Sequence, residues 1–381
     1  MRGFARSEYE ARLKQAQDLM AAHDLSALLL TTEAEIRYFT GFLTRFWESP
    51  SRPWYLVLPA AGLPIAVIPS IGAALMGQTW VSDIRTWRAP VPMDDGVSLL
   101  TDTLNEVAGA GRIGLPSGPE TYLRTPQDDW QRITAGLKGT VVSDGGITAR
   151  LRAVKSDAEI AKIETACTIA GRAFARVPQI AQQGRALSAV FRDFQVLLLA
   201  EGADWVPYLA GGAGPDGYGD VISPASDQPL KGGDVLMLDT GAVFDGYFCD
   251  YDRNFAVGPA SQVARDAHAR LIDAVDAAAD IARPGTTAAQ VFHAMDKIVT
   301  GGAGGSDAGR LGHGLGMQLT EGLSLIASDH TVLAPGMVIT LEPGIDTGNG
   351  RMMVHEEDIA ITETGCRFLS PRADRALVPL T

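Results

Sequence analysis

The sequence predicts two domains of different class, an α/β domain over residues 1–150 and an α+β domain over residues 151–381. Three observations carry this prediction. Helical and strand patterns alternate through the first 150 residues, as they do in α/β folds. A capping box, Ser156-Asp157-Ala158-Glu159, opens a new long helix directly after them. Beyond this helix, strand-rich segments follow pairs of helices, which is typical of an α+β domain.

The first domain begins with an amphipathic helix. The pattern Ser7-Glu8-Tyr9-Glu10 predicts a capping box at its start, and the helical periodicity ends near Ala22. A short buried strand is expected at Leu25–Leu30. The stretch Trp54–Ser70 then reads as a strand, a turn marked by proline and glycine, and a second strand.

The second domain contains a short internal repeat. Ile180–Phe191 and Ile281–Phe292 share Ile-Ala at the start, glycine at the fifth place and Val-Phe at the end, and each lies between two helical stretches. A chance match is one interpretation; a duplicated unit whose halves share a core is the other. The strand-rich segments 203–258 and 309–381 are then expected to form a mostly antiparallel sheet covered by those helices.

The composition excludes several classes of protein. The chain of 381 residues has a net charge of −13, which argues against a nucleic-acid or an anionic-membrane partner. Its three cysteines are too few for a disulfide framework and fit a reducing compartment. The N-terminus lacks the apolar region of a signal peptide, and no segment approaches the ~20 apolar residues of a membrane span. We therefore expect a cytoplasmic location.

Acidic residues occur where strands of the second domain should enter the core. Asp239 ends an apolar run, Asp250 follows eleven residues later beyond a turn, and Glu342 and Glu357 lie on two further strands. Aspartates near a turn are usually solvated, but four buried carboxylates that repel one another need a cation. Together with His313, which lies between two glycines, they suit a pair of divalent ions such as Mn²⁺, Co²⁺, Fe²⁺ or Zn²⁺.

This order of Asp, Asp, His in a Gly-His-Gly motif, Glu before Pro-Gly and Glu before Asp resembles the pita-bread metallopeptidase family. That family includes methionine aminopeptidase, prolidase, aminopeptidase P and the metal-free creatinase. The α/β first domain, the duplicated second half and the segment "LRAVKSDAEIAKIETA" resemble the prolidase, aminopeptidase P and creatinase branch. The resemblance covers nearly the whole chain. It implies a creatinase-like N-terminal domain over 1–150 and a pita-bread catalytic domain over 151–381.

The resemblance also implies roles for the five residues. Asp239 matches a ligand of one ion, Asp250 and Glu357 match the bridging carboxylates, and His313 and Glu342 match the ligands of the second ion. Glu342 is also expected to accept a proton. The implied protein is a homodimeric metallohydrolase with two divalent ions, Mn²⁺ first and Co²⁺, Fe²⁺ or Zn²⁺ as alternatives. It would cleave the C–N bond of a small peptide or amide through a metal-bridging hydroxide, as an Xaa-Pro dipeptidase or aminopeptidase does.

The chain departs from the peptidases of this branch at three places. The branch usually has a histidine upstream of the first Asp, where this chain has Ile222-Ser223-Pro224, and another past the Gly-His-Gly motif, where it has Thr320. Threonine can form a hydrogen bond but cannot act as a cationic acid. His355 stands two residues before Glu357, where the family commonly has arginine. These departures leave the metal site intact and the substrate open.

Two other functions therefore remain open from the sequence. The first is a non-peptidase relative with the same metal site, an ectoine-type amide or ring hydrolase or a sulfoniopropionate-type lyase. Gly241 weakens the lyase interpretation, because the lyases usually carry a second Asp there. The other is a catalytically silent binding protein, against which the five retained ligands argue.

Four residues are candidates for contacts with the substrate. His355 and Thr320 are predicted to assist catalysis or bind the substrate; the alternatives are a hydrogen-bonded strand histidine and a loop residue. Arg45 and Trp47 follow a strand that, in creatinase-like dimers, lends residues to the neighbouring pocket. A guanidinium there would suit a carboxylate and an aromatic ring a cation. A surface arginine beside a core tryptophan is the alternative.

Overall fold

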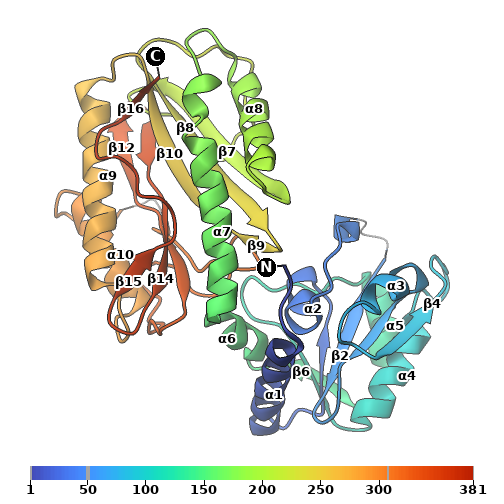
Figure 1. The fold of residues 1–381 in the computed structure, drawn as a ribbon. Helices are drawn as coiled ribbons and strands as arrows, with labels where there is room; N and C mark the ends of the chain where they lie inside the picture. Colours follow the sequence, from blue (N-terminus) through green and yellow to red (C-terminus); the bar gives the residue numbers. More distant parts are fainter. Residues whose placement is uncertain (1, 49–51, 307–308, 381) are drawn as a thin grey trace. The chain divides into compact units, whose positions relative to one another are not determined.

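The structure is a computed structural model that describes residues 2–48, 52–306 and 309–380. The chain forms two compact units, Met1–Arg152 and Ala153–Thr381. Figure 1 shows the helices and strands of both. The first is a mixed α/β unit and the second is an α+β unit, which confirms the predicted fold class.

The first unit is built on a six-stranded sheet in the order β4-β3-β2-β1-β5-β6. Strand β1 pairs antiparallel with β2 and parallel with β5, so the sheet is mixed. All four residues of β1, Ala-Leu-Leu-Leu, are buried, as expected of a central strand covered on both faces. The elements of this unit are α1 (Arg6–Ala22), β1 (Ala27–Leu30), α2 (Glu33–Thr40), η1 (Phe46–Glu48), β2 (Tyr55–Pro59), β3 (Ile65–Pro69), η2 (Ser70–Gly72), α3 (Ala73–Met76), β4 (Asp83–Trp87), α4 (Val97–Ala108), β5 (Arg112–Leu115), α5 (Gln127–Gly136), β6 (Thr140–Ser143) and α6 (Ile147–Ala153).

The start of α1 differs from the prediction. The helix begins at Arg6, its N-cap is Ala5, and no side chain caps it. The acidic residues of the expected capping box form ion pairs one turn along the helix instead, Glu8 with Arg12 and Glu10 with Arg6. The prediction of a Ser7 cap was therefore wrong. The two glutamates of the expected capping box thus form i,i+4 ion pairs along the helix.

The second unit contains three sheets and two pairs of helices. The largest sheet runs β16-β10-β8-β7, with β9 also paired to β8; the others run β11-β14-β15 and β12-β13. The pairings are antiparallel except for β10 with β16. The elements are α7 (Asp157–Phe174), η3 (Val177–Gln179), α8 (Leu187–Ala200), β7 (Trp205–Pro215), β8 (Asp234–Phe244), β9 (Tyr247–Phe248), β10 (Tyr251–Val257), α9 (Gln262–Ile281), α10 (Ala288–Val299), β11 (Val338–Leu341), β12 (Gly344–Gly348), β13 (Arg351–Val354), β14 (Glu357–Ile361), β15 (Cys366–Phe368) and β16 (Val378–Leu380).

The helices of this unit pack against its strands. Helix α7 contacts β8 and α9 contacts β12 and β13, and both helices run alongside the strands in Figure 1. The predicted capping box at the start of α7 is confirmed, because Ser156 and Glu159 each accept the other's backbone N–H. Each repeated segment joins two helices, α7 to α8 and α9 to α10. The helices thus pack against mostly antiparallel strands as predicted, but within the described residues these strands form three sheets and not the single sheet expected.

The register of the large sheet determines where acid enters the core. Ten of the eleven residues of β8 are buried. Asp239 lies on this strand directly opposite Ala210 of β7 and Asp252 of β10. Residues directly opposite one another in an antiparallel pair share a face of the sheet. Two carboxylates are therefore held on one buried face by backbone pairing alone.

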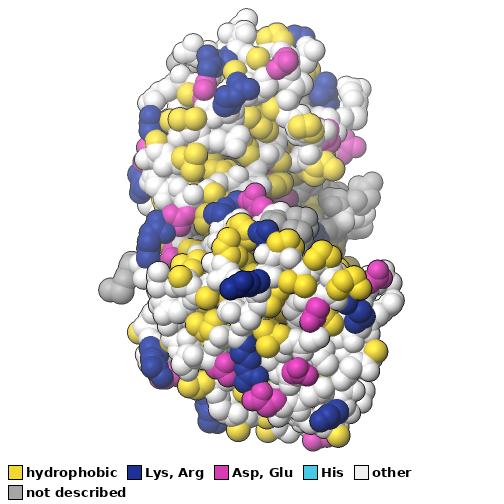
Figure 2. Space-filling model, turned by 90° about the vertical axis from the view of Figure 1, so that its right-hand side faces the viewer, with side chains coloured by type: hydrophobic (Ala, Val, Ile, Leu, Met, Phe, Trp, Pro, Cys, Tyr) yellow, Lys and Arg dark blue, Asp and Glu magenta, His cyan; other side chains and the backbone are white. Residues whose placement is uncertain are grey.

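On the face seen in Figure 2, charged side chains of one sign do not gather into a large region. On this face, lysine and arginine side chains are interspersed with acidic and hydrophobic ones. Within the described residues, no helix combines the length and the apolar character that crossing a membrane requires.

A buried ion pair holds the segment that follows His313. Lys155 Nζ lies 3.0 Å from Glu321 Oε1, and the two side chains are 2% and 8% exposed. We predict that Lys155→Met lowers the free energy of unfolding by about 3–5 kcal/mol, because it leaves the Glu321 carboxylate buried without its cation. Calorimetric unfolding measures this change. Arg367→Met, which removes a surface partner of Glu164, is the control and should cost less than about 1 kcal/mol; equal losses in both variants would contradict the prediction.

Candidate metal centre

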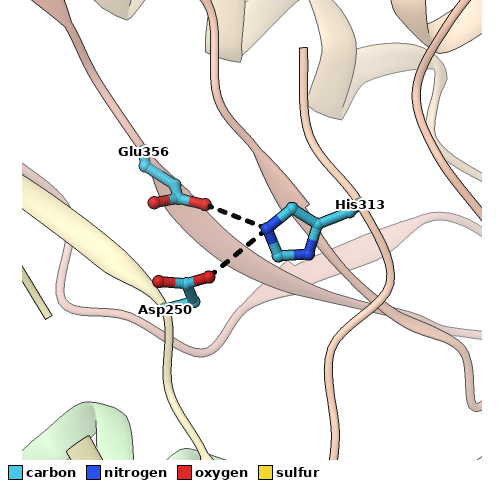
Figure 3. A group of neighbouring side chains, drawn as sticks. All are labelled: Asp250, His313 and Glu356. Carbon is cyan, nitrogen blue, oxygen red and sulfur yellow. Dashed lines mark ion pairs between the residues drawn. The ribbon is translucent and has the colours of Figure 1, made fainter. Parts of the chain in front are cut away.

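Three buried side chains converge in the second unit: Asp250, His313 and Glu356. Each offers a ligand atom, and these atoms lie within 4.8 Å of one another. His313 Nε2 is 3.3 Å from Asp250 Oδ2 and 4.0 Å from Glu356 Oε1. Figure 3 shows both carboxylates on the same side of the imidazole ring, pointing toward Nε2. This arrangement leaves one point in space that all three side chains face.

Asp239 and Glu342 extend the cluster. The charge of Glu342 raises the pKa values of Asp239, Asp250 and Glu356, and that of Asp239 raises the pKa values of Asp250 and Glu356. The side chains must be near neighbours for their charges to act in this way. The structure therefore brings together four of the five predicted metal ligands, namely Asp239, Asp250, His313 and Glu342.

Two more buried carboxylates hold the backbone of this cluster. Asp358 Oδ2 accepts the backbone N–H of Asp250 at 3.0 Å, and Asp252 Oδ1 accepts that of Glu356 at 3.1 Å. Asp250 lies between β9 and β10, and Glu356 directly precedes β14. Neither residue is inside a regular strand. These hydrogen bonds hold the backbone at the two positions where the regular hydrogen bonding between strands ends.

Glycines on both sides of His313 allow its loop to approach the neighbouring strands. A Cβ on Gly312, where φ is +133°, would lie 2.2 Å from the Thr340 carbonyl oxygen. One on Gly314 would lie 2.0 Å from that of Glu321. Only glycine fits at either position. The His313 N–H and C=O groups can then bond to Thr340.

The hydrogen bond of His313 decides which ring nitrogen faces the acids. Nδ1 lies 3.0 Å from the Gly314 carbonyl oxygen, which can only accept, so Nδ1 carries the proton. Burial lowers the pKa of His313 to about 4, and the ring is neutral at pH 7. Nε2 therefore presents a lone pair toward Asp250 and Glu356. This tautomer and orientation are those of a metal-ligating histidine.

The charge of Arg310 lowers the pKa values of Asp250 and Glu342, but it does not outweigh the burial and mutual repulsion of the cluster carboxylates. Burial and the neighbouring charges hold the pKa values of Asp239, Asp250 and Glu356 well above their ordinary values, and burial raises the pKa of Glu342 to about 7. Among the described residues, Asp239 Oδ1, Asp250 Oδ1 and Glu356 Oε1 are buried without a hydrogen-bond partner. Buried oxygens are rarely left so. Oxygen atoms and one neutral imidazole fit a borderline-hard divalent cation.

Glu357 lies outside this cluster. Its carboxylate pairs with Arg253 Nη2 at 2.9 Å and accepts the Ser370 hydroxyl and the Ala373 N–H. Burial alone would raise its pKa, but Arg253 and His355 outweigh burial and lower the pKa to about 2. Successive side chains of an extended strand point to opposite faces. Glu356 faces the cluster in its place, and the assignment of Glu357 as a ligand is corrected accordingly.

His355 shares the face of Glu357. Its side chain is fully buried, with Nδ1 3.3 Å from Asp252 Oδ1 and Nε2 3.3 Å from Glu357 Oε1. Burial lowers the pKa of His355, but the two neighbouring carboxylates outweigh it and leave the pKa raised. The ring is held between two carboxylates, so the predicted substrate contact is not supported. Counting back two residues from Glu356 gives Val354, so His355 does not take the place of the family arginine either.

The other predicted contacts lie outside the acid cluster. Thr320 is half-buried, and its Oγ1 accepts a hydrogen bond of 3.1 Å from Arg310 Nη2. Arg45 and Trp47 belong to the first unit. Arg45 is exposed and pairs with Glu48, whereas Trp47 is buried against Trp54. The structure shows no substrate, so a binding role for these three residues stays a prediction.

The sequence analysis missed two residues of the site, Glu356 and Tyr208. Tyr208 on β7 forms a hydrogen bond with the Asp239 side chain, and burial and the Asp239, Asp250 and Glu356 charges raise its pKa. The acidic run "HEED" is visible in the sequence, but the sequence does not show which of its side chains point into the core. For Tyr208, the only signal was its place in a strand before a glycine pair.

Comparisons with known proteins agree with this site. Residues 161–363 match the family described as metallopeptidase family M24, and residues 12–154 match the creatinase/prolidase N-terminal domain. A probable dipeptidase, PepE, of Mycobacterium bovis is 32% identical over 372 residues, which are 96% of this chain and 95% of that protein. An Xaa-Pro dipeptidase of Pyrococcus furiosus is 31% identical over 235 residues, 60% of this chain and 66% of that one.

Solved structures have the same fold. The crystal structure of dipeptidase PepE from Mycobacterium ulcerans has a TM-score of 0.85 and 28% identity, and the match covers 99% of both chains. A prolidase from Thermococcus sibiricus has a TM-score of 0.87 with 23% identity, over 99% of this chain and 100% of that one. At 23% identity, the likeness to the Thermococcus sibiricus prolidase shows a common fold and nothing further.

Adjacent glutamates allow a matched test of the cluster. We predict that Glu356→Gln weakens Mn²⁺ binding by more than the ~10–100-fold that loss of an outer-shell partner costs. Glu357→Gln should keep most of the affinity but lower the free energy of unfolding by about 3–5 kcal/mol, because Arg253 loses its buried partner. Titration calorimetry with Mn²⁺ and thermal unfolding measure both. The reverse pattern, with Glu357→Gln losing the metal, would restore Glu357 as the ligand.

The effect of the metal on stability should depend on pH. The pKa of Glu342 is raised from 4.5 to about 7, so the folded metal-free protein binds a proton there more tightly than the unfolded chain does. The metal-free protein therefore loses stability as the pH rises from about 4.5 to 7. A cation replaces that proton. We predict that saturating Mn²⁺ raises the melting temperature more at pH 8 than at pH 6; an equal or smaller rise at pH 8 would contradict this prediction.

Proposed function

Because the chain belongs to metallopeptidase family M24, we propose that it is a metal-dependent peptidase that hydrolyses Xaa-Pro dipeptides with two divalent cations, Mn²⁺ by preference. One observation carries the proposal: the buried carboxylates of Asp250 and Glu356 converge with a neutral imidazole, with Asp239 and the half-buried Glu342 acting on them electrostatically, and three of the carboxylate oxygens have no hydrogen-bond partner among the described residues. Co²⁺, Fe²⁺ and Zn²⁺ suit the same oxygen and nitrogen ligands.

We assign the ligands from the positions of the side chains. Asp239 would bind one cation, Asp250 and Glu356 would bridge, and His313 and Glu342 would bind the second. In this set Glu356 takes the bridging role first expected of Glu357. Cations held there would polarise the scissile carbonyl and provide a nucleophile at neutral pH. Asp358 and Asp252 position the two bridging residues through their backbone N–H groups.

Glu342 is the group best suited to move a proton. As a carboxylate of the proposed metal centre, Glu342 would lie within reach of the attacking water, which is the first requirement of a general base. It can accept a proton from the attacking water and return it to the leaving nitrogen. Thr320 cannot supply that proton, and His355 is enclosed by Asp252 and Glu357. The neutral Tyr208 hydroxyl can donate a hydrogen bond to Asp239 and so orient it.

The substrate class rests on relatives named dipeptidase and Xaa-Pro dipeptidase. A second candidate is a non-peptidase activity at the same centre, an amide or ring hydrolase or a sulfoniopropionate-type lyase. Ile222 and Thr320 favour it, because they stand where the peptidases of the branch usually have histidine. A cytoplasmic homodimer, in which Arg45 and Trp47 approach the pocket of the neighbouring subunit, is part of the proposal and rests on the family resemblance.

Hydrolysis of a small dipeptide panel tests the proposed function. Protein reloaded with Mn²⁺ should release proline from Ala-Pro and Met-Pro, and Asp239→Ala should lower kcat/KM by about 10³-fold or more, as when one member of a catalytic unit is removed. Asp273→Ala, which alters an exposed pair with Arg375, is the matched control and should keep full activity. If the protein binds two ions but releases no proline, the non-peptidase candidate replaces the first.

A further inference from the structure

The second unit contains a cavity of about 280 Å³ that none of the proposed metal ligands lines. Its inner wall includes Tyr251, Arg253 and Phe255 of β10. Asp252, which lies directly opposite Asp239, alternates with these residues along the strand. Successive side chains of a strand point to opposite faces. The cavity therefore lies on the face of β10 that Asp239 does not share.

The walls of the cavity are largely apolar. In addition to the aromatic residues of β10, it is lined by Phe174, Pro178 and Val378. Helix α7 contributes Gly171, where a Cβ would lie only 2.6 Å from Pro371 Cγ, so a glycine is needed for this close approach. An apolar cavity of ~150 Å³ already holds benzene. The space therefore accommodates an apolar side chain of the size of leucine.

The solvent side of the cavity is formed by residues 371–376, which we call the strap. Hydrogen bonds tie the strap to the elements beneath it. The Ala373 N–H donates to Glu357 Oε1 at 3.0 Å. His268 Nε2 of α9 donates to the Asp374 carbonyl oxygen at 2.9 Å. The strap is thus held in place before any ligand binds, as in most small-molecule sites.

Two residues of opposite charge on the strap, Arg372 and Asp374, line the cavity and are exposed. Arg372 Nη2 donates to Asp276 on α9 at 2.5 Å, and the other N–H groups of Arg372 form no hydrogen bond with a described residue. Within the same part of the chain, the Asp374 carboxylate is in no ion pair. A guanidinium matches a carboxylate, and a carboxylate attracts an ammonium group. The edge of the apolar cavity therefore suits a molecule that carries both charges.

We propose that this cavity is a binding site for a free apolar amino acid such as leucine. The side chain of the amino acid occupies the space between α7 and β10, its carboxylate binds Arg372, and its ammonium group binds Asp374. An apolar carboxylic acid or an apolar amine would match only one of the two charges. The site uses none of the proposed metal ligands, so the inference goes beyond the proposed function and does not depend on it.

Titration calorimetry with the Mn²⁺-loaded protein tests the site. L-Leucine should bind at least about tenfold more tightly than isocaproate, which lacks the ammonium group, and isoamylamine, which lacks the carboxylate, because each analogue loses one charge-assisted hydrogen bond. Glycine, which has no apolar side chain, should bind more weakly than leucine. Absence of leucine binding up to about 10 mM, or equal affinity for leucine and glycine, overturns the inference.

Variants at exposed positions locate the bound amino acid. Arg372→Gln and Asp374→Asn should each weaken leucine binding by about tenfold or more. Ala175→Trp, at the exposed end of α7, should fill the cavity and abolish binding. Arg375→Gln, on the same strap but not lining the cavity, is the matched control and should bind leucine as the wild type does.

A change in the metal centre separates the two sites. Asp239→Ala should bind leucine with the affinity of the wild type, because Asp239 lies on the other face of the strands. Loss of leucine binding in Asp239→Ala, together with unchanged binding in Arg372→Gln and Ala175→Trp, would place the amino acid at the metal centre and overturn the inference.

Discussion

The mutual repulsion of three buried carboxylates and one half-buried carboxylate is the constraint on which the second unit depends. Asp239, Asp250, Glu342 and Glu356 come from different strands or strand ends, and each raises the pKa of others or has its own raised. A fold that only needed stability would place apolar residues here, because a buried unpaired charge costs several kcal/mol. The sheets and the glycine-flanked loop of His313 hold these groups together against that cost. Cations remove the repulsion, so metal binding and folding of this region are linked.

Both oxygens of Glu357 have hydrogen-bond partners, whereas Glu356 beside it has a buried oxygen without one. Glu357 is bonded by Arg253, Ser370 and Ala373, and Asp252 is bonded by His355 and the Glu356 backbone. These two acids lie one or two residues from the unpartnered ones along the chain. The division between Glu356 and Glu357 therefore follows the alternation of the chain, whereas Asp252 shares the face of Asp239. For these two glutamates it is visible as a contrast between complete and incomplete hydrogen bonding, while Asp252 keeps one buried oxygen, Oδ2, without a partner.

The sequence was informative where local chemistry decides the structure, and not where register does. The α7 capping box, the helix-joining repeats and the acids at strand ends could be read from residue types and spacing. The choice between Glu356 and Glu357 could not, because a shift of one residue in a strand exchanges its two faces. The same shift explains the misplaced role of His355. Ser7 failed as a cap because Glu8 and Glu10 had arginine partners one turn away, a competition that the capping pattern alone does not reveal.

Substrate choice in this chain has to come from the loops around the centre. With two divalent cations bound, the four proposed carboxylate ligands would have a net charge near zero. This charge does not depend on which amide is cleaved. The residues that differ from the peptidase pattern, Ile222 and Thr320, are not ligands, and Ile222 is 82% exposed. A change from histidine to threonine keeps a group that can donate and accept a hydrogen bond but removes one that can act as a cationic acid. Arg310 faces Thr320. The departure from the family pattern therefore changes the hydrogen bonding of the loop after His313 and leaves the proposed metal ligands unchanged.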